Sequence, residues 1–284
     1  MIVNSLRSQY GLQELLNQIK LPRATYYDQL KRIKKPDKYA EVKSFIIHTY
    51  HDSFETYGYR RIHAKAIKAG FHYAAETIRC LMSTLGLKVS IYSKHTSRYS
   101  SYKGQVGRIA PNVLKRDFNA IQPLTVFHTD VTQVRLNNGQ WGYLSCITDQ
   151  ASGEVVAARV GSSANNRLIQ DTLHDLQERI IPTVSPILHS DQGWQYQQKS
   201  YRATLKNAHI TQSMSRKGNC HDNAPIESFF NLLKRECLNR SKIEDIKQLK
   251  KLVSDYTHWF NYERISMNKN GLTPVEYRNE TITK

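Results

Sequence analysis

The stretch His189-Ser190-Asp191-Gln192-Gly193-Trp194-Gln195-Tyr196 decides how the rest of the chain is interpreted. It follows a short apolar run, Pro186 to Leu188, which predicts a buried strand ending at Asp191. After 35 intervening residues comes a second carboxylate, Glu227, early in an apolar-periodic segment that predicts a helix over 223–239. A third carboxylate, Asp130, lies upstream in F-H-T-D-V-T. The pattern predicts three acidic side chains on neighbouring elements of one domain.

The segment around this stretch has the pattern of a mixed α/β domain. Val, Thr and Phe dominate 124–136, an Asn-Asn-Gly turn follows, and 141–149 completes a predicted hairpin. The further elements expected are a strand at 154–161, an amphipathic helix at 164–181, a helix at 197–207 and a strand at 210–214. The order β-β-β-α-β-α-β-α predicts a mixed sheet flanked by helices.

The first third of the chain is predicted to be helical. Leu12, Leu15, Leu16 and Ile19 form one apolar face, and a second helix follows Pro22. This pair fits a helix-turn-helix and an ordinary helical hairpin about equally, because the motif is short. Further helices are expected at 39–51 (with Val42, Phe45, Ile46 and Ile47 inward), 60–70 and 74–85. The last two form a second pair like a helix-turn-helix.

The basic residues are concentrated at the front of the chain. Residues 1–121 carry 21 Lys+Arg against 8 Asp+Glu, and residues 122–284 carry 20 against 16. This asymmetry indicates a polyanion-binding module ahead of a domain with its own acidic site, although charge alone fits ribosome association or solubility. Arg60 and Arg61 open a predicted helix and are expected to contact phosphates, solvation being the alternative. Residues 88–116 mix cations with Tyr92, Tyr99 and Tyr102, which suits a DNA-contacting linker.

Other classes of protein fit the composition poorly. Hydrophobic content of 39% argues against disorder, and no run approaches the roughly 20 apolar residues of a membrane span. The N-terminus has no signal-peptide pattern. The four cysteines have no close spacing, which suits a reducing compartment, so a cytoplasmic protein is expected. A zinc site at His48 and His51 is excluded because no Cys-x-x-Cys is present.

Three converging carboxylates suit Mg²⁺-dependent phosphoryl transfer. Mg²⁺ prefers hard oxygen ligands and keeps several waters, so Asp130, Asp191 and Glu227 would be sufficient ligands. Asp149 is expected to end its strand and Asp222 to cap or precede the helix of Glu227. The remaining candidates are assigned to the solvated face of their helix: Asp171, Asp175 and Glu178.

Three basic side chains accompany these carboxylates in the sequence. Lys234 follows Glu227 by two helical turns and therefore shares its face, where spacing alone favours a surface lysine. His128 and His189 each precede an aspartate by two positions and share its strand face. Hydrogen bonding around the metal ligands is their expected role.

Four motifs together make the sequence recognisable: Y-G-Y-R-R-I (57–62), H-S-D-Q-G-W-Q-Y (189–196), S-R-K-G-N-C-H-D-N-A-P-I-E-S-F-F (215–230) and L-T-P-V-E-Y-R (272–278). They closely resemble the second-reading-frame (OrfB) transposases of bacterial insertion sequences, which have a D-D-E core like that of retroviral integrases. The resemblance runs from about Tyr10 to Arg278. It implies a ribonuclease-H-like core and DNA cleavage and strand transfer at element ends.

By motif position, the resemblance implies that Asp130, Asp191 and Glu227 bind Mg²⁺, or Mn²⁺ in its place, as two ions. It makes Lys234 a DNA contact. Further expected DNA contacts are Arg216 and Lys217, and Asn223 joins the two histidines around the ligands. The family has Trp where this chain has His128, a departure that affects packing beside Asp130.

The domains expected on this basis are a helical DNA-binding region at 1–87, a basic linker at 88–121, the catalytic core at 122–240 and C-terminal helices at 241–284. The resemblance also implies double-stranded DNA partners, namely terminal inverted repeats and target DNA. It implies a homo-oligomer on DNA and a longer frameshift fusion with an upstream frame. Two rival hypotheses are a DNA-binding regulator with an inactive core and a metal-dependent nuclease that cuts without joining.

Overall fold

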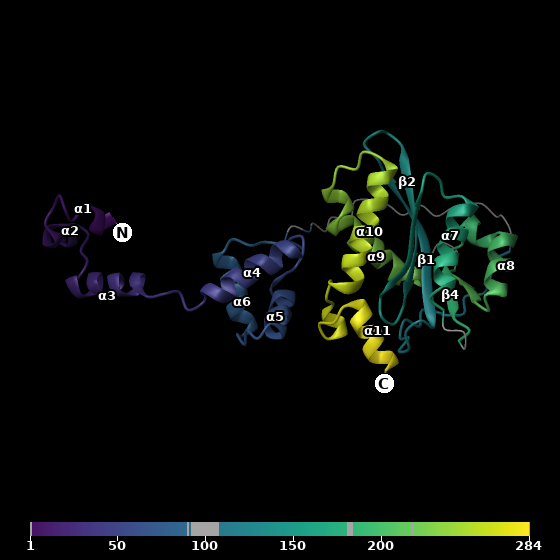
Figure 1. Cartoon of the computed structure of the whole chain (residues 1–284), viewed down its shortest axis with the longest axis horizontal. Coiled ribbons are helices and arrows are strands. Elements are labelled where there is room, and N and C mark those ends of the chain that lie inside the picture. Colours follow the sequence, from purple (N-terminus) through teal and green to yellow (C-terminus); the bar gives the residue numbers. More distant parts are fainter. Residues whose placement is uncertain (1, 90, 92–107, 181–183, 217–218, 284) are drawn as a thin grey trace. The chain divides into compact units, whose positions relative to one another are not determined.

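The computed structural model describes residues 2–89, 91, 108–180, 184–216 and 219–283. The chain divides into two compact units, Met1–His48 and Thr49–Lys284. The first contains α1 (Ile2–Leu6), α2 (Leu12–Gln18), α3 (Arg23–Lys34) and the start of α4 (Ala40–Asp52) (Figure 1).

Two expectations about the apolar faces of these early helices are wrong. Helix α2 ends at Gln18, so Ile19 is the residue that caps it and is 55% exposed, while Leu16 is buried as expected. On α4, Val42 and Ile46 are buried but Ile47 is 38% exposed, because it lies one position round the helix from Ile46. Helix α1 was not expected from the sequence.

The second unit begins with two of the predicted helices. They are α5 (Tyr59–Lys68) and α6 (Ala75–Thr84), within two residues of the expected bounds. Gly86 has a φ of +71° directly after the cap residue Leu85, and this left-handed glycine ends α6. The two helices pack through Ile62, Ala66 and Ile78, which are fully buried.

A five-stranded sheet forms the centre of the second unit. Its strands are β1 (Val126–Arg135), β2 (Trp141–Asp149), β3 (Val155–Gly161), β4 (Ile187–Ser190) and β5 (Thr211–Met214). The spatial order is β3-β2-β1-β4-β5, antiparallel across β3, β2 and β1 and parallel from β1 through β4 to β5. This confirms the predicted mixed sheet, with β1 in the middle.

Helices cover both faces of the sheet. Helices α7 (Asn166–Gln177) and α8 (Lys199–Asn207) lie on one face, and α9 (Ala224–Glu236) and α10 (Ile246–Tyr262) lie on the other (Figure 1). The predicted apolar side of α7 is confirmed, since Leu168, Ile169 and Leu173 are buried against the sheet. Four short 3₁₀ turns complete the core: η1 (Trp194–Gln197), η2 (Cys220–Asn223), η3 (Leu238–Arg240) and η4 (Met267–Lys269).

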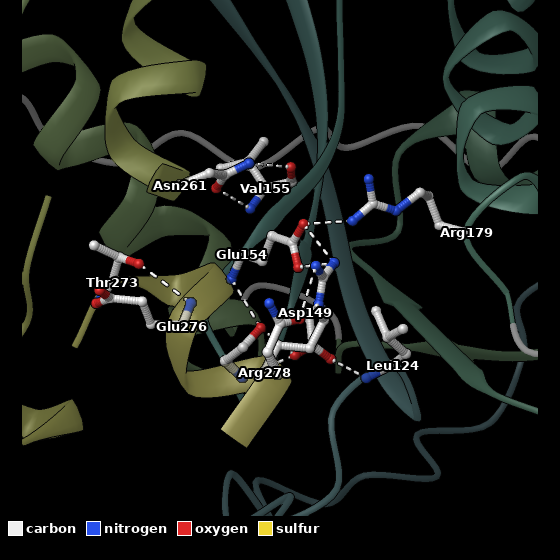
Figure 2. Close-up of polar contacts among 11 residues, drawn as sticks. Leu124, Asp149, Glu154, Val155, Arg179, Asn261, Thr273, Glu276 and Arg278 are labelled. Carbon is white, nitrogen blue, oxygen red and sulfur yellow. Dashed lines mark hydrogen bonds and ion pairs between the residues drawn. The ribbon is translucent and has the colours of Figure 1, made fainter. Parts of the chain in front are cut away.

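The C-terminal helix α11 (Pro274–Ile282) is attached to the sheet through a buried carboxylate (Figure 2). Glu154, at the start of β3, accepts hydrogen bonds from Arg278 at 2.7 and 2.9 Å and from Arg179 at 2.5 Å. The Asn261 amide pairs with both main-chain groups of Val155 at 2.9 Å. The L-T-P-V-E-Y-R motif therefore contains a capping box, formed by Thr273 and Glu276, and ends in an arginine that holds α11 to the sheet.

Candidate active site

The sheet places Asp130 and Asp191 side by side. Strand β1 pairs in parallel with β4, and His128 is opposite His189 in the register. Asp130 lies two residues after His128, within β1. Asp191 lies two residues after His189, just after the end of β4. Because side chains alternate along extended backbone, both aspartates lie on the same face of the sheet as the histidine that precedes them.

The loop after β4 holds the Asp191 carboxylate in place. Its Oδ1 accepts the backbone N–H of Gly193 at 2.8 Å. A Cβ on Gly193 would lie 2.9 Å from that oxygen and 2.8 Å from Oε1 of Gln195. The φ of Gly193 is −55°, which other residues also adopt, so a side chain here would act by displacing the ends of the Asp191 and Gln195 side chains rather than by straining the backbone.

Helix α9 supplies the third carboxylate and the lysine. Glu227 is in its first turn, two residues after Pro225, and Lys234 lies in its last turn. Both side chains are half-buried. Ile226, Phe230 and Leu233 of α9 are buried, and Phe229 packs on Tyr256 and Phe260 of α10. This packing fixes the face that Glu227 and Lys234 share.

The charges of these four side chains act on one another. Burial raises the pKa of Asp130 well above its ordinary value, and the charges of Asp191 and Glu227 raise it further, while Lys234 opposes both. Burial also raises the pKa of Asp191, and the hydrogen bond from Gly193 opposes that shift. Burial raises the pKa of Glu227 as well, and the negative charge of Asp191 raises it further. Burial lowers the pKa of Lys234, and Asp130 opposes that shift. The protein therefore concentrates negative charge at a place with little water to stabilise it.

The carboxylates are neighbours rather than a closed set of ligands. Among residues 2–89, 91, 108–180, 184–216 and 219–283, no group of three His, Cys, Asp or Glu side chains could already hold a metal ion. The chemistry of the three does suit Mg²⁺, because they are hard oxygen donors whose mutual repulsion a cation would relieve.

Two buried histidines support the strands behind the aspartates. The His128 ring makes hydrogen bonds with Oδ1 of Asn223 at 2.8 Å and Oε1 of Gln150 at 2.7 Å. Asn223 also donates to the carbonyl of Thr129 at 3.1 Å, which ties the start of α9 to β1 next to Asp130. The imidazole thus occupies, with polar partners, the position where the family resemblance implies Trp.

The second histidine, His189, is held by hydroxyl groups. It contacts Ser213 at 2.8 Å and Ser215 at 3.1 Å, and its ring lies 5.5 Å from that of His128. Burial lowers the pKa of His189 to about 4 and also lowers that of His128. Both rings are therefore neutral at pH 7. No hydrogen bond within the described part of the chain joins either ring to an aspartate of the site.

The expectation that Asp222 caps or precedes α9 is met by its second alternative, because Asp222 lies before the helix and does not cap it. Asn223 is the cap residue and makes no side-chain capping bond. The buried Asp222 carboxylate instead accepts three hydrogen bonds from Arg216 at 2.8–2.9 Å and others from Arg116 and Asn112 at 2.7 and 3.1 Å. These cations hold its pKa well below the usual range. Asp222 thus fixes the loop that leads into α9, while Asp149 ends β2 as expected.

The basic residues expected to contact DNA have different environments. Arg60 is exposed and lies over the Tyr59 ring, 5.7 Å from its centroid. Arg61 is half-buried and lies over Tyr57. The exposed Arg216 already pairs with Asp222. Lys217 lies outside the described residues, as do the linker tyrosines Tyr92, Tyr99 and Tyr102.

A pocket of about 230 Å³ lies beside Lys234. Neither Lys234 nor Arg135, which also lines it, forms an ion pair with any residue that the structure describes. The Arg135 guanidinium lies over the Trp141 ring at 5.0 Å. The other lining residues are mostly polar: Gln133, Val134, Asn137, Leu238, Asn239, Ser241 and Ile243.

The sheet order, the helices on both faces and the position of the carboxylates define a ribonuclease-H-like core of the integrase class. Family models agree with this assignment. Residues 120–220 and 227–282 match two models described as "Integrase core domain", and residues 37–95 match one described as "HTH-like domain".

Relatives over the whole length give the family. The chain is 43% identical over 280 residues to transposase InsK of the insertion element IS150 from Escherichia coli (strain K12), covering 99% of this chain and 98% of that one. It is 35% identical to the probable transposase of IS1353 from Shigella flexneri, covering 98% of this chain and 54% of that protein. The chain belongs to the family of bacterial insertion-sequence transposases with an integrase core.

Solved structures are similar at lower identity. The catalytic core of HTLV-2 integrase in complex with magnesium aligns at 15% identity and a TM-score of 0.41, over 56% of this chain and 98% of that one. The simian T-cell lymphotropic virus intasome with a PP2A regulatory subunit aligns at 13% identity and a TM-score of 0.48, over 76% and 73%.

Several residues that shape the site carried no separate signal in the sequence. Gly193 stands in the quoted motif, but its contact with Asp191 depends on the turn that follows β4. Gln150 and Arg116 are distant in sequence from the groups they hold, His128 and Asp222.

No helix of the described residues is long and apolar enough to cross a membrane, and Cys80, Cys146 and Cys237 are free thiols.

Proposed function

We propose that this transposase cuts DNA at the ends of an insertion sequence and joins those ends to target DNA through a D-D-E site formed by Asp130, Asp191 and Glu227. The observation that carries the proposal is the register of β1 against β4, which brings the two aspartates level on one face. Helix α9 adds Glu227 and Lys234 from the same side, and their charges act on Asp130.

The residues present fit a Mg²⁺ site, with Mn²⁺ as a substitute and two ions as the expected number. Asp130, Asp191 and Glu227 would be the protein ligands. When bound, the metal would neutralise charge on the phosphodiester oxygens and lower the pKa of a bound water. Gly193 orients the Asp191 carboxylate, and Asn223 with His128 fixes β1 beside Asp130.

The reaction consists of two in-line displacements at phosphorus. In the first, a water oxygen bonds to the phosphorus, the bond to the 3′ oxygen breaks, and that oxygen takes a proton to become a 3′ hydroxyl. In the second, this hydroxyl loses its proton and attacks a phosphodiester of target DNA, releasing a new 3′ hydroxyl there. The protein acts by positioning the strands and balancing charge. Lys234 would place its ammonium against the phosphate beside the site.

Double-stranded DNA is the proposed partner, both as element ends and as target. The helices that match the HTH-like model would bind the terminal repeats, with Arg60 as an exposed phosphate contact and Arg61, Arg216 and Lys217 as further candidates. The pocket beside Lys234 offers a path for the strand, because it is lined by Lys234 and Arg135, neither of which forms an ion pair within the described part of the chain. We further propose a homo-oligomer on DNA, a frameshift fusion with an upstream frame as the longer form, and action in the cytoplasm.

The decisive experiment measures cutting and joining of an oligonucleotide that carries the element end. Asp191→Asn and Glu227→Gln should abolish both products with Mg²⁺ present while DNA binding stays within about twofold of wild type. Asp171→Asn, which removes a carboxylate from the exposed side of α7, is the matched control and should retain activity. Mg²⁺-dependent joining by either site variant would disprove the assignment.

The same assay separates the two rival functions. A nuclease without joining activity gives cut product and no joined product. A regulator with an inactive core gives neither product but still binds the end. Only wild-type joining that requires the three carboxylates supports the transposase mechanism.

A further inference from the structure

The first tyrosine of the Y-G-Y-R-R-I motif connects the segment before α5 to the segment after α10. Tyr57 is 1% exposed. Its hydroxyl donates to the carbonyl of Glu263 at 3.2 Å and accepts the backbone N–H of Ile265 at 2.8 Å. A single side chain therefore satisfies two main-chain groups where α10 has just ended at Tyr262.

The segment that Tyr57 holds contains Arg264, whose side chain is buried against the end of α9. Arg264 donates to both oxygens of Glu236 at 2.7 and 2.8 Å, and Tyr256 donates a third hydrogen bond at 2.8 Å. The Arg264 and Glu236 side chains are 5% and 1% exposed. A buried ion pair is stable only with such complete hydrogen bonding, so the position of Arg264 and that of Glu236 depend on each other.

Further contacts join the same two parts of the chain. The Phe54 ring meets Trp259 edge to face at 5.3 Å, and Tyr57 lies 6.3 Å from the same ring. Arg240, just after α9, donates to the carbonyl of Phe54 and lies 3.6 Å from Glu55. The guanidinium of Arg61 lies over Tyr57 at 5.3 Å. Residues 54–61 thus contact η3, the turn that follows α9, as well as α10.

Glu236 is the last residue of the helix that carries Glu227 and Lys234. At about 1.5 Å per residue, Glu227 lies roughly 14 Å from this end of a rigid helix. A change of tilt at Glu236 therefore moves both site residues relative to Asp130. The chain of contacts runs from Tyr57 through the 263–265 segment and Glu236 into α9.

We propose that Tyr57 is a positioning residue for strand transfer, which sets the orientation of α9 through Arg264 and Glu236. This inference rests on the proposed function of the site. It gives the Y-G-Y-R-R-I motif a second task besides DNA contact: the helices α5 and α6 are fixed to the helix that supplies Glu227, so an end bound by them is presented to a correctly placed carboxylate.

The test is Tyr57→Phe in the full-length protein, with Tyr50→Phe as the matched control. Both variants keep a buried ring and lose one hydroxyl. Tyr50 donates to the carbonyl of Lys88, a bond that does not involve the C-terminal helices. Three quantities are measured: affinity for the element end, the joining rate at saturating DNA, and amide hydrogen exchange over 233–240 and 263–266.

We expect Tyr57→Phe to bind the end within twofold of wild type, to join it at least fivefold more slowly, and to exchange faster in both segments. Tyr50→Phe should match wild type in all three. Joining by Tyr57→Phe at the wild-type rate, or an equal loss in both variants, overturns the proposal.

The exchange measurement also keeps the two proposals apart. If wild-type protein fails to join DNA at all, the proposed function fails, and the role of Tyr57 is then decided by exchange alone. Faster exchange over 233–240 in Tyr57→Phe supports the connection to α9, and unchanged exchange there refutes it.

Discussion

Gly193 donates its backbone N–H to the carboxylate of Asp191 at 2.8 Å, and a Cβ at position 193 would lie 2.9 Å from the same carboxylate oxygen, so that oxygen would have to shift. The hydrogen bond favours the ionised carboxylate, against the burial that raises its pKa. The loop after β4 therefore does two things with one residue: it sets the direction of the Asp191 side chain and helps to keep it charged.

Gly193→Ala tests this relationship. The added Cβ would lie 2.9 Å from Oδ1, so the carboxylate has to turn away or the loop has to shift. We expect joining to fall by 10-fold or more and the Mg²⁺ concentration for half-maximal activity to rise, with DNA binding unchanged. The control is Gly11→Ala, because Gly11 has an ordinary φ and open space around its Cα, and this variant should behave as wild type. Gly153 is unsuitable as a control because its φ is +73°. Unaltered Mg²⁺ dependence in Gly193→Ala would show that the contact is dispensable.

Arg278→Leu should destabilise the protein. It leaves the buried Glu154 carboxylate with Arg179 as its remaining arginine partner, and breaking a buried pair typically costs about 3–5 kcal/mol. Urea unfolding at constant m value would give the difference in free energy of unfolding. Arg167→Leu removes an exposed pair with Asp171 on α7 and should cost less than about 1 kcal/mol. Equal effects of the two variants would refute the importance of the Glu154 contact.

His189 should make the metal-free protein less stable in acid. Its pKa is about 4 when folded and 6.5 ordinarily, so below pH 6.5 the unfolded chain binds a proton that the folded chain does not. Stability from this group is complete above pH 6.5 and is lost as pH falls towards 4. The loss is on the order of 3 kcal/mol, at about 1.4 kcal/mol per pKa unit.

The measurement for this prediction is urea unfolding in EDTA at several pH values from 7.5 to 4. His189→Asn removes the titrating group, so its stability should depend less on pH than that of wild type across this window. The carboxylates of the site titrate in both proteins and cancel in the comparison. Parallel pH profiles for the two proteins would contradict the prediction.

Lys234→Gln should shift the pH dependence of joining. Lys234 favours the ionised form of Asp130, so its removal raises the pKa of that carboxyl still further. We expect the acid limb of the rate profile to move to higher pH. The slope of the logarithm of the DNA-binding constant against the logarithm of salt concentration should also become shallower by about one, because one phosphate contact is lost. Lys206→Gln, on α8, is the control; an unchanged acid limb in Lys234→Gln would exclude the electrostatic contact.

Much of the second unit could be predicted because its signals are local. Enrichment in Val, Thr and Phe predicted β1, Asn-Asn-Gly predicted the hairpin, and the amphipathic pattern over 164–181 predicted α7. The errors are also local in origin. Ile19 and Ile47 both fit a helical period but are exposed to solvent. Ile19 lies just past the end of α2, and Ile47 lies one position round α4 from the buried Ile46.

Roles that depend on distant contacts could not be predicted in the same way. Asp222 precedes a helix and is a residue type that often caps helices. Its carboxylate is instead hydrogen-bonded to Arg116 and Arg216. Tyr57 and Arg61 stand in a motif that suggests DNA contact, but Tyr57 is buried on the 263–265 segment. In both cases, the partner is a charge or a main-chain group supplied by another part of the chain.

The sequence by itself determined the elements of this protein and the three carboxylates that they carry, because hydrophobic period, turn residues and motif spacing are properties of neighbouring residues. Only the tertiary structure decided how the site is assembled. Parallel pairing of β1 with β4 set Asp130 level with Asp191, the close approach of Gly193 oriented one of them, and the buried Arg264–Glu236 pair fixed the helix of Glu227. Each of these depends on groups far apart in sequence, which come together only when burial excludes water and makes their pairing obligatory.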